Sequence, residues 1–281
     1  MENTRRNFLK IAGISALGFG VGSLVSATTQ VEHEVAPTQQ PAEHNTEKLP
    51  EPKPVENVKS ESSTQSAVKT AGRWGMAIYT SKLTEPIRKK IISACHVTHN
   101  VPHMENKRHE IKWIWEEPYT HAFPENEHEY IDEKTHTQPF LTLCNHCNNP
   151  PCVRACPTKA TFQRADGIVL MDFHRCIGCR FCMAACPYGS RSFNFRDPRP
   201  FISQLNMDFP TRMKGVVEKC NFCAERLEMG KMPACVEVSE GTIVFGDLHD
   251  PNSEIRHILK ESYTIQRKQN LGTMPSVYYI V

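Results

Sequence analysis

Eight of the twelve cysteines stand in two blocks near the middle of this 281-residue chain. The first block reads CNHCNNPPCVRACP at residues 144–157, and the second reads CIGCRFCMAACP at residues 176–187. Thiolates are ligands for soft metal ions and for iron–sulfur clusters. The second block has the spacing C-x2-C-x2-C-x3-C-P, at which three thiolates hold one [4Fe–4S] cluster and the fourth reaches a neighbouring cluster. The spacing therefore predicts iron–sulfur chemistry.

Two blocks of this kind complete each other, because the fourth cysteine of each block serves the other cluster. Set A, the expected ligands of cluster A, consists of Cys144, Cys147, Cys152 and Cys186. Set B, the expected ligands of cluster B, consists of Cys176, Cys179, Cys182 and Cys156. Pro157 and Pro187 follow the fourth cysteines and turn the chain away, since proline has a fixed φ and no amide donor.

Zinc and disulfides are the two other uses of such cysteines. Structural zinc sites usually combine two CxxC pairs that lie a dozen or more residues apart, whereas the second block holds its cysteines within residues 176–186. An even number of cysteines in an exported chain is typical of disulfides. Residues 144–199 carry eight Lys and Arg against three Asp and no Glu, an excess that suits anionic clusters and is also common on a solvated face.

The composition limits the class of protein. The formal net charge of +2 gives no indication of nucleic-acid binding. The hydrophobic fraction of 39% is sufficient for a folded chain in which metal–ligand bonds replace part of the core. Twelve cysteines also divide into three complete ligand sets.

The N-terminal residues have the pattern of an export signal. Arg5 and Arg6 precede an apolar stretch at residues 11–25, and Val25-Ser26-Ala27 is a small-residue cleavage site. We therefore expect a Tat signal peptide at residues 1–27, with an uncleaved anchor as the alternative. Tat exports folded proteins, so cofactors are inserted before export. Residues 28–73 are rich in proline and polar residues, which predicts a disordered linker.

The remaining residues, 74–281, are expected to form a loop-rich α+β domain. Short strands are predicted at residues 74–82, 242–248 and 276–281, a β-hairpin at 160–172 and a helix at 254–263. No further hydrophobic run approaches the roughly 20 residues that span a bilayer.

A second group of cysteines becomes interpretable through a family resemblance. The segment CHVTHNVP at residues 95–102 and the segment EKCNFCAERLEMGKMPACVEVSEG at residues 218–241 resemble the outer cysteine blocks of four-cluster ferredoxin subunits of respiratory membrane complexes. Leu83 and Ser239 stand where that family has cysteines, and two further ligands of its first block are absent. By the exchange of fourth ligands, the four missing residues belong to one cluster.

The four ligands of the other cluster that these two outer blocks would share are all present. Set C, the ligands that the resemblance implies for cluster C, consists of Cys220, Cys223, Cys235 and Cys95. The alternative is that Cys95 is an unrelated buried thiol and that the third cluster has three cysteine ligands or is absent. The resemblance thus implies three [4Fe–4S] clusters and a tandem ferredoxin-like fold of two double-cluster modules. In this arrangement a central module at about 140–200 is inserted between the halves of an outer module at about 74–139 and 201–281.

Seven histidines lie between Cys95 and Cys144, and no pair of them has a convincing ligand spacing. We expect this stretch to be a packed surface excursion or a partner-docking region. Trp113, Trp115 and Tyr119 would be its interface anchors.

Four segments narrow the resemblance to the DsrO iron–sulfur subunits of the Dsr MKJOP membrane complex of dissimilatory sulfur metabolism. They lie at residues 113–132, 174–201, 250–259 and 271–281. This resemblance implies a periplasmic, Tat-exported electron-transfer subunit without catalytic residues, bound peripherally to the cytoplasmic membrane through its complex. The implied partners are an NrfD-type quinone-interacting integral membrane subunit, a multihaem cytochrome c and the other Dsr subunits.

Two alternatives remain. One is the electron-transfer subunit of a periplasmic molybdenum reductase of the polysulfide or tetrathionate type, for which all four ligand sets would be expected. The other is an exported binding protein that is stabilised by disulfides or zinc and has no redox function.

Overall fold

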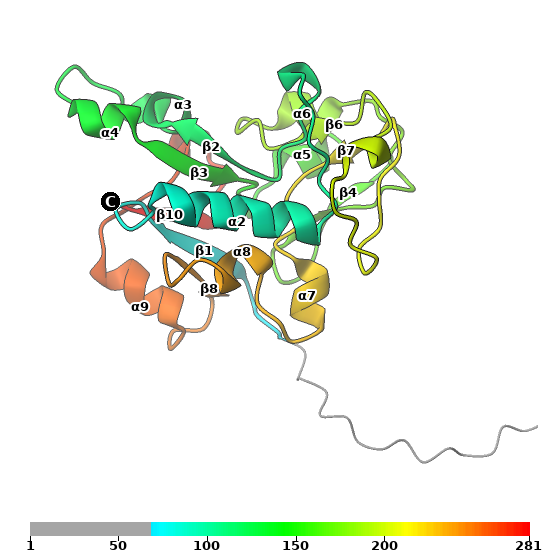
Figure 1. The fold of residues 1–281 in the computed structure, drawn as a ribbon. Helices are drawn as coiled ribbons and strands as arrows, with labels where there is room; N and C mark the ends of the chain where they lie inside the picture. Colours follow the sequence, from blue (N-terminus) through cyan, green and yellow to red (C-terminus); the bar gives the residue numbers. More distant parts are fainter. Residues whose placement is uncertain (1–68) are drawn as a thin grey trace, which may run out of the picture. The chain divides into compact units, whose positions relative to one another are not determined.

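Strand β1 (Trp74–Tyr79) is an inner strand of a four-stranded sheet with the order β8-β1-β10-β9 (Figure 1). It pairs antiparallel with β8 (Ile243–Asp247) and parallel with β10 (Val277–Ile280), which pairs antiparallel with β9 (Thr264–Ile265). Five of the six residues of β1 are buried, as expected for an apolar strand covered on both faces. The sheet thus joins segments from before and after the central cysteine blocks and confirms the three predicted strands.

The computed structural model describes residues 69–281. The expected signal peptide at residues 1–27 and residues 28–68 of the expected linker lie outside this part of the chain. None of the helices within residues 69–281 has the length and apolar character needed to cross a membrane.

The linker ends earlier than the sequence indicates. The Lys69 amide donates to the Leu227 carbonyl over 3.1 Å. The amides of Gly72 and Arg73 donate to the two carboxylate oxygens of Asp247, over 2.8 and 2.9 Å. Residues 69–73 are therefore attached to the end of β8 and to the helix that contains Leu227.

Helix α2 (Glu85–Thr98) is the longest helix of the described residues and carries Cys95. It begins after Thr84, has Glu85 in its first turn and has a proline at its start, all of which favour a helix N-terminus. Ile91 and Cys95, one turn apart, form its buried face. In Figure 1 the helix lies across the molecule between the four-stranded sheet and the antiparallel pair of β2 (Ile114–Pro118) and β3 (Pro139–Leu143). This helix was not among the elements predicted from the sequence.

Three two-stranded antiparallel sheets complete the strands of the described residues. They pair β2 (Ile114–Pro118) with β3 (Pro139–Leu143), β4 (Thr161–Gln163) with β5 (Val169–Met171), and β6 (Ser192–Phe193) with β7 (Val217–Glu218). The β4–β5 pair is the hairpin predicted at residues 160–172, and Gly167 in its turn has φ +83°.

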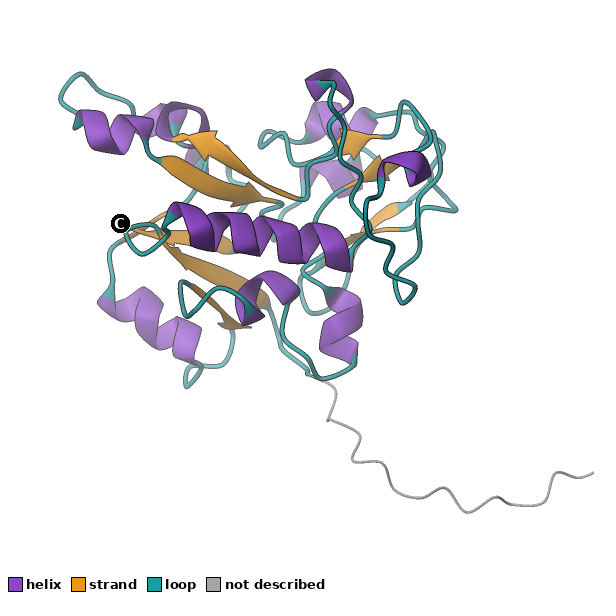
Figure 2. Ribbon diagram, in the orientation of Figure 1, coloured by secondary structure: helices purple, strands orange, loops and turns teal. Residues whose placement is uncertain are grey.

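Short helices and loops make up most of the remainder (Figure 2). The α-helices are α3 (Tyr119–Ala122), α4 (Glu133–Thr137), α5 (Pro151–Arg154), α6 (Phe181–Ala185), α7 (Ala224–Glu228), α8 (Ala234–Glu237) and α9 (Glu254–Glu261). The 3-10 turns are Lys107–His109, Pro124–Asn126, Arg199–Phe201 and Gln269–Leu271. Helix α9 confirms the prediction at residues 254–263, and the whole is the expected loop-rich α+β fold.

The aromatic residues expected to be interface anchors belong to the interior, and that expectation is wrong. Trp113, Trp115 and Tyr119 are all buried, with Trp113 only 1% exposed. The Trp113 indole donates to Glu218 Oε2 over 3.0 Å, and its ring stacks on His99 at a centroid distance of 4.5 Å. These three side chains therefore pack in the interior instead of presenting a docking surface.

Candidate metal centre

The four cysteines of set A surround one cavity. Cys144 follows β3, Cys152 lies in α5 and Cys186 ends α6, while Cys147 comes from the loop between β3 and α5. All four line the same cavity. Buried Asn145 also lines it, and neither polar side-chain atom of Asn145 has a hydrogen-bond partner among the described residues. Four thiols and an unpaired amide side chain fit a polar, thiolate-ligated group.

The four cysteines of set B surround a second cavity. Cys156, Cys176, Cys179 and Cys182 all line it. The loop that carries three of them contains Gly178 at φ +70°, where a Cβ would lie 2.4 Å from the Gly215 carbonyl oxygen. Only glycine fits this close approach. In contrast to set C, three of the four set B cysteines are partly accessible to solvent.

Set C is assembled from three helices and a strand end. Cys95 comes from α2, Cys220 follows β7, Cys223 precedes α7 and Cys235 lies in α8. All four are buried. Burial, and then the nearby thiolates of Cys220, Cys223 and Cys235, raise the pKa of Cys95 well above its usual value. Cys95 is therefore close to the other three, as its placement in one ligand set requires.

Burial keeps several of these cysteines in the neutral thiol form. Burial and then the neighbouring Cys144 raise the pKa of Cys147 to about 12, and burial raises the pKa of Cys235 to about 12. Burial likewise raises the pKa of Cys223 well above its usual value. Such thiols are neutral near pH 7, and metal ligation would release their protons.

Backbone amides point at several sulfur atoms. The Thr161 amide donates to Cys156 Sγ over 3.4 Å, the Phe222 amide to Cys220 Sγ over 3.5 Å and the Ala234 amide to Cys223 Sγ over 3.4 Å. Hydrogen bonds of this kind favour thiolate over thiol. They would also stabilise the added charge of a reduced cluster.

A buried arginine, which no sequence pattern marks, lies between sets A and B. Arg191 is 5% exposed, and its Nη2 donates to Cys152 Sγ over 3.0 Å. Burial raises the pKa of Cys182 in set B, and the nearby Arg191 opposes that rise. The overall excess of Lys and Arg was the only signal in the sequence, and it does not identify which of them is buried.

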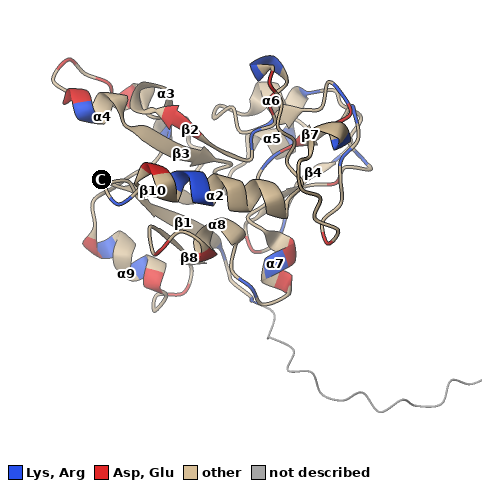
Figure 3. Ribbon diagram, viewed as in Figure 1, with Lys and Arg blue, Asp and Glu red and all other residues tan. Residues whose placement is uncertain are grey.

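Lys219 is the corresponding cation near set C. Its side chain is buried, and Nζ donates to the Cys220 carbonyl over 2.7 Å and to the Val169 carbonyl. Figure 3 shows Lys and Arg throughout the ribbon, with Asp and Glu among them. Arg191 and Lys219 differ from exposed cations beside the cysteines, such as Arg175, because they are held in the interior, where solvent screens their charges least.

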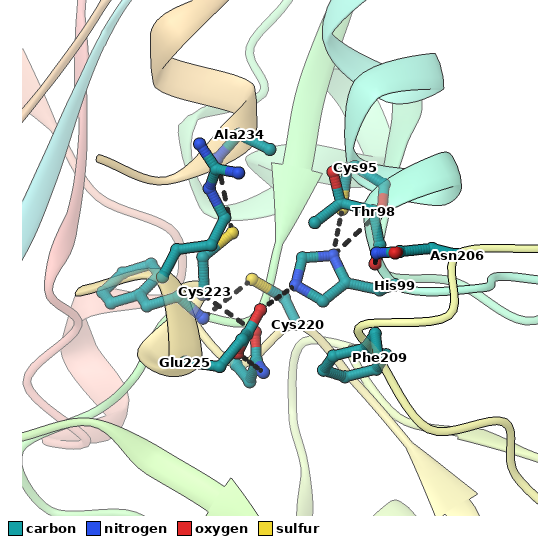
Figure 4. Close-up of polar contacts among 12 residues, drawn as sticks. Cys95, Thr98, His99, Asn206, Phe209, Cys220, Cys223, Glu225 and Ala234 are labelled. Carbon is teal, nitrogen blue, oxygen red and sulfur yellow. Dashed lines mark hydrogen bonds and ion pairs between the residues drawn. The ribbon is translucent and has the colours of Figure 1, made fainter. Parts of the chain in front are cut away.

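The side chains of His99, Cys223 and Glu225 lie close enough to share a metal ion, with ligand atoms within 4.8 Å of one another. However, both ring nitrogens of His99 are engaged, Nε2 with Glu225 Oε1 at 2.8 Å and Nδ1 with the Cys95 carbonyl oxygen at 2.9 Å. Figure 4 shows the His99 ring between Cys95, on one side, and Glu225 and Cys220, on the other. We interpret His99 as a buried residue that braces set C.

The positions that lack cysteine are filled by ordinary packing. Leu83 follows β1, Ser239 precedes β8, and these two strand ends are joined by the Tyr79 amide, which donates to the Thr242 carbonyl over 2.9 Å. Leu83 is a buried core residue. Ser239 Oγ donates to the Val236 carbonyl over 2.8 Å and accepts from the Ile243 amide over 3.3 Å. Neither residue offers a ligand.

The three sets follow one another in the order B, A, C. Cys152 of set A and Cys182 of set B pack in the same buried apolar group. His146 of the set A loop stacks on Phe222 of the set C loop, with ring centroids 3.7 Å apart, so sets A and C are also neighbours. No comparable contact joins sets B and C within residues 69–281. Set A is therefore the middle set.

Comparisons with known proteins agree with this chemistry. The family model of the 4Fe-4S dicluster domain matches residues 136–198, the range that contains all cysteines of sets A and B. The Hdr-like menaquinol oxidoreductase iron–sulfur subunit 1 of Archaeoglobus fulgidus is 37% identical over 298 residues, which cover 98% of this chain and 97% of that protein.

Two further relatives are similar over shorter ranges. The iron–sulfur cluster-binding subunit of menaquinone reductase from Nitratidesulfovibrio vulgaris is 33% identical over 236 residues, 74% of this chain and 88% of that protein. The B subunit of polysulfide reductase from Wolinella succinogenes is 39% identical over 139 residues, 49% of this chain and 64% of that protein. The chain thus belongs to the family of iron–sulfur electron-transfer subunits of respiratory oxidoreductase complexes.

Proposed function

We propose that this protein binds three [4Fe–4S] clusters on sets A, B and C and relays electrons between a quinone-interacting membrane subunit and a periplasmic redox partner. The observation that carries the proposal is the similarity over almost the whole chain to the iron–sulfur subunit of a menaquinol oxidoreductase. Its support is that the twelve cysteines form three groups of four, each drawn together from distant segments.

A [4Fe–4S] cluster on each set would supply one-electron chemistry in which no substrate bond is made or broken. The chain's own residues would hold and tune it. The thiols release their protons on ligation, amides such as that of Thr161 donate to the sulfur atoms, and Arg191 places a positive charge beside Cys152. The apolar packing around set C excludes water from its four buried cysteines.

We further propose the narrower identity of a DsrO-type subunit. It would be exported by the Tat route to the periplasm and bound peripherally to the membrane through an NrfD-type integral membrane subunit. A multihaem cytochrome c and the other Dsr subunits would be its further partners. The support is the set of four segments at residues 113–132, 174–201, 250–259 and 271–281, together with the signal pattern at residues 1–27.

The alternative is the electron-transfer subunit of a periplasmic molybdenum reductase. Its support is that 49% of this chain is 39% identical to the B subunit of polysulfide reductase. Such a subunit would be expected to have a fourth ligand set. Leu83 and Ser239 stand at two of those positions, and both are committed to packing and backbone hydrogen bonds. This favours the first proposal.

The test begins with anaerobic purification of the protein, matured with its signal, together with the proteins that accompany it. We expect about twelve iron and twelve sulfide per chain, since each of three clusters contributes four of each. Addition of a reduced menaquinone analogue to the complex should produce the EPR signals of reduced clusters. Protein that contains zinc or disulfides and no iron would refute electron transfer. A co-purified molybdenum subunit would favour the alternative.

A further inference from the structure

Two aromatic rings join the loops of set A and set C. His146 stands between Cys144 and Cys147, and Phe222 stands between Cys220 and Cys223. Their rings stack face to face, with centroids 3.7 Å apart and planes inclined by 18°. Both side chains are 1% exposed. The contact thus connects two CxxC loops that are far apart in the sequence.

The backbone at both residues is unusual. His146 has φ +41° and Phe222 has φ +55°, in the left-handed region that side chains rarely adopt. The corresponding position of the set B loop is Gly178, at φ +70°. Glycine would satisfy this loop geometry without strain. The two loops that carry a bulky ring instead are the two whose rings meet, which indicates a role for the side chains.

Each ring also contacts a neighbour outside the pair. The Val169 amide donates to Nδ1 of His146 over 3.1 Å. Phe245 of β8 packs edge-on against Phe222, with centroids 5.2 Å apart and planes inclined by 88°. Trp74 of β1 stacks on Phe245 at 4.9 Å. The stack is therefore tied to the hairpin β4–β5 on one side and to the four-stranded sheet on the other.

We propose that the His146–Phe222 stack is the positioning contact that fixes the separation of sets A and C. This inference rests on the proposed function, because a fixed separation matters only if both sets carry redox groups. Outer-sphere electron exchange falls steeply with distance, and the ring contact places the loops of Cys144 and Cys220 side by side. A rigid, close-packed pair of rings holds that separation constant, since packed interiors do not deform continuously.

The experiment compares purified holoproteins after full reduction. Phe222→Leu and His146→Leu each remove one ring, the double variant removes both, and Phe222→Tyr retains the ring. Phe245→Leu is the matched control, because it removes a ring contact to Phe222 without touching the set A loop. The readouts are iron content and the spin–spin interaction between reduced clusters A and C, measured by EPR.

We expect full iron content in all variants and loss of the A–C interaction in Phe222→Leu and His146→Leu. The double variant should lose no more of the A–C interaction than either single variant does. Phe222→Tyr and Phe245→Leu should retain the wild-type spectrum. If Phe222→Leu does not load iron, Phe222→Met, which fills the space without a flat ring, replaces it.

An unchanged A–C interaction in fully loaded Phe222→Leu and His146→Leu would overturn the positioning role and leave the proposed function intact. An equal loss in Phe245→Leu would also overturn it, since the effect would then be one of general packing. Wild-type protein without reducible clusters would instead refute the proposed function itself.

Discussion

Arg191 donates a hydrogen bond from Nη2 to Sγ of Cys152 over 3.0 Å, although its side chain is buried. Its Nη1 donates to Thr161 Oγ1 over 3.2 Å and contacts Met171 Sδ at 3.1 Å. No carboxylate is among these partners. A buried cation without a carboxylate needs another anion nearby. The nearest candidates are the thiolates of sets A and B.

The first prediction concerns the reduction potentials of clusters A and B. Arg191→Gln should shift both to more negative values, because reduction adds negative charge beside the lost cation. A unit charge about 6 Å away contributes at most about 3 kcal/mol at an effective dielectric constant of about 20. We therefore expect a shift of roughly 60–120 mV, since a tenfold change in a one-electron equilibrium is about 59 mV.

EPR-monitored redox titration measures this shift. In Arg191→Lys the reduction potentials of clusters A and B should be close to those of the wild type. The potential of cluster C should be unaffected in both variants. Arg175→Gln is the control, because Arg175 precedes set B in the sequence and is exposed to solvent, which screens its charge. Equal shifts in Arg175→Gln and Arg191→Gln would show that burial of the charge is unimportant.

The second prediction concerns the exchange of fourth ligands between the central blocks. Cys186→Ser should eliminate the same EPR signal as Cys147→Ser, although Cys186 lies in the other block. Cys156→Ser should likewise match Cys179→Ser. Each variant should lose about four iron atoms per chain. If Cys186→Ser instead matches Cys179→Ser, each block ligates its own cluster and sets A and B are wrong.

The third prediction concerns a buried ion pair next to set C. Arg212 Nη2 lies 2.7 Å from Glu218 Oε2, and both side chains are 0% exposed. Arg212→Met leaves the carboxylate buried without its cation, which typically costs about 3–5 kcal/mol. We expect a clear decrease in the urea midpoint of unfolding at equal iron content, followed by circular dichroism.

The control for this pair is a surface pair of the same kind. Lys90 and Glu240 are 2.8 Å apart and more than half exposed, so Lys90→Met should change stability by less than about 1 kcal/mol. Arg212→Met combined with Glu218→Gln should recover part of the loss, because the remaining buried group is neutral. Equal midpoints for Arg212→Met and Lys90→Met would contradict the prediction.

The fourth prediction concerns the attachment of residues 69–73. In Asp247→Asn only one oxygen remains to accept from the amides of Gly72 and Arg73. Hydrogen bonds to charged groups contribute about 1.5–3 kcal/mol, so hydrogen exchange at these two amides should accelerate by about tenfold or more. Asp250→Asn, which alters a turn contact to Asn252, should leave both amides protected.

Much of the fold could be predicted because its strands and its last helix have strong local patterns. The apolar run of β1 and the Ala-Asp-Gly turn of the β4–β5 hairpin are visible in the sequence without any knowledge of tertiary contacts. Helix α2 was missed although its signals are present, namely a proline in the first turn and apolar residues one turn apart at Ile91 and Cys95. Its last turns coincide with the cysteine segment at residues 95–102, where the ligand spacing is the stronger pattern.

The grouping of cysteines could be proposed from spacing, whereas the surroundings of the groups could not. Trp113 was expected at an interface, because an aromatic residue among acidic ones resembles a docking segment, and it is instead buried against His99 and Phe209. Lys219 and Phe222 are next to set C cysteines in the sequence, but their burial and their contacts, like those of Arg191, depend on long-range packing. No local pattern predicts which basic and aromatic residues are buried in this way.

The order of strands in the main sheet has a mechanical consequence. The chain enters its described part at Lys69 and passes directly into β1, which has β8 on one side and β10 on the other. A force that pulls on the N-terminal end would therefore act in shear on the hydrogen bonds of β1 with β8 and with β10. It would also act on the hydrogen bond from the Arg73 amide to Asp247. Set C lies close to this line of force, because Cys95 is on the helix that follows β1 and the Lys69 amide bonds to Leu227 in the helix that begins after Cys223. Tension from that end would therefore act on the surroundings of set C.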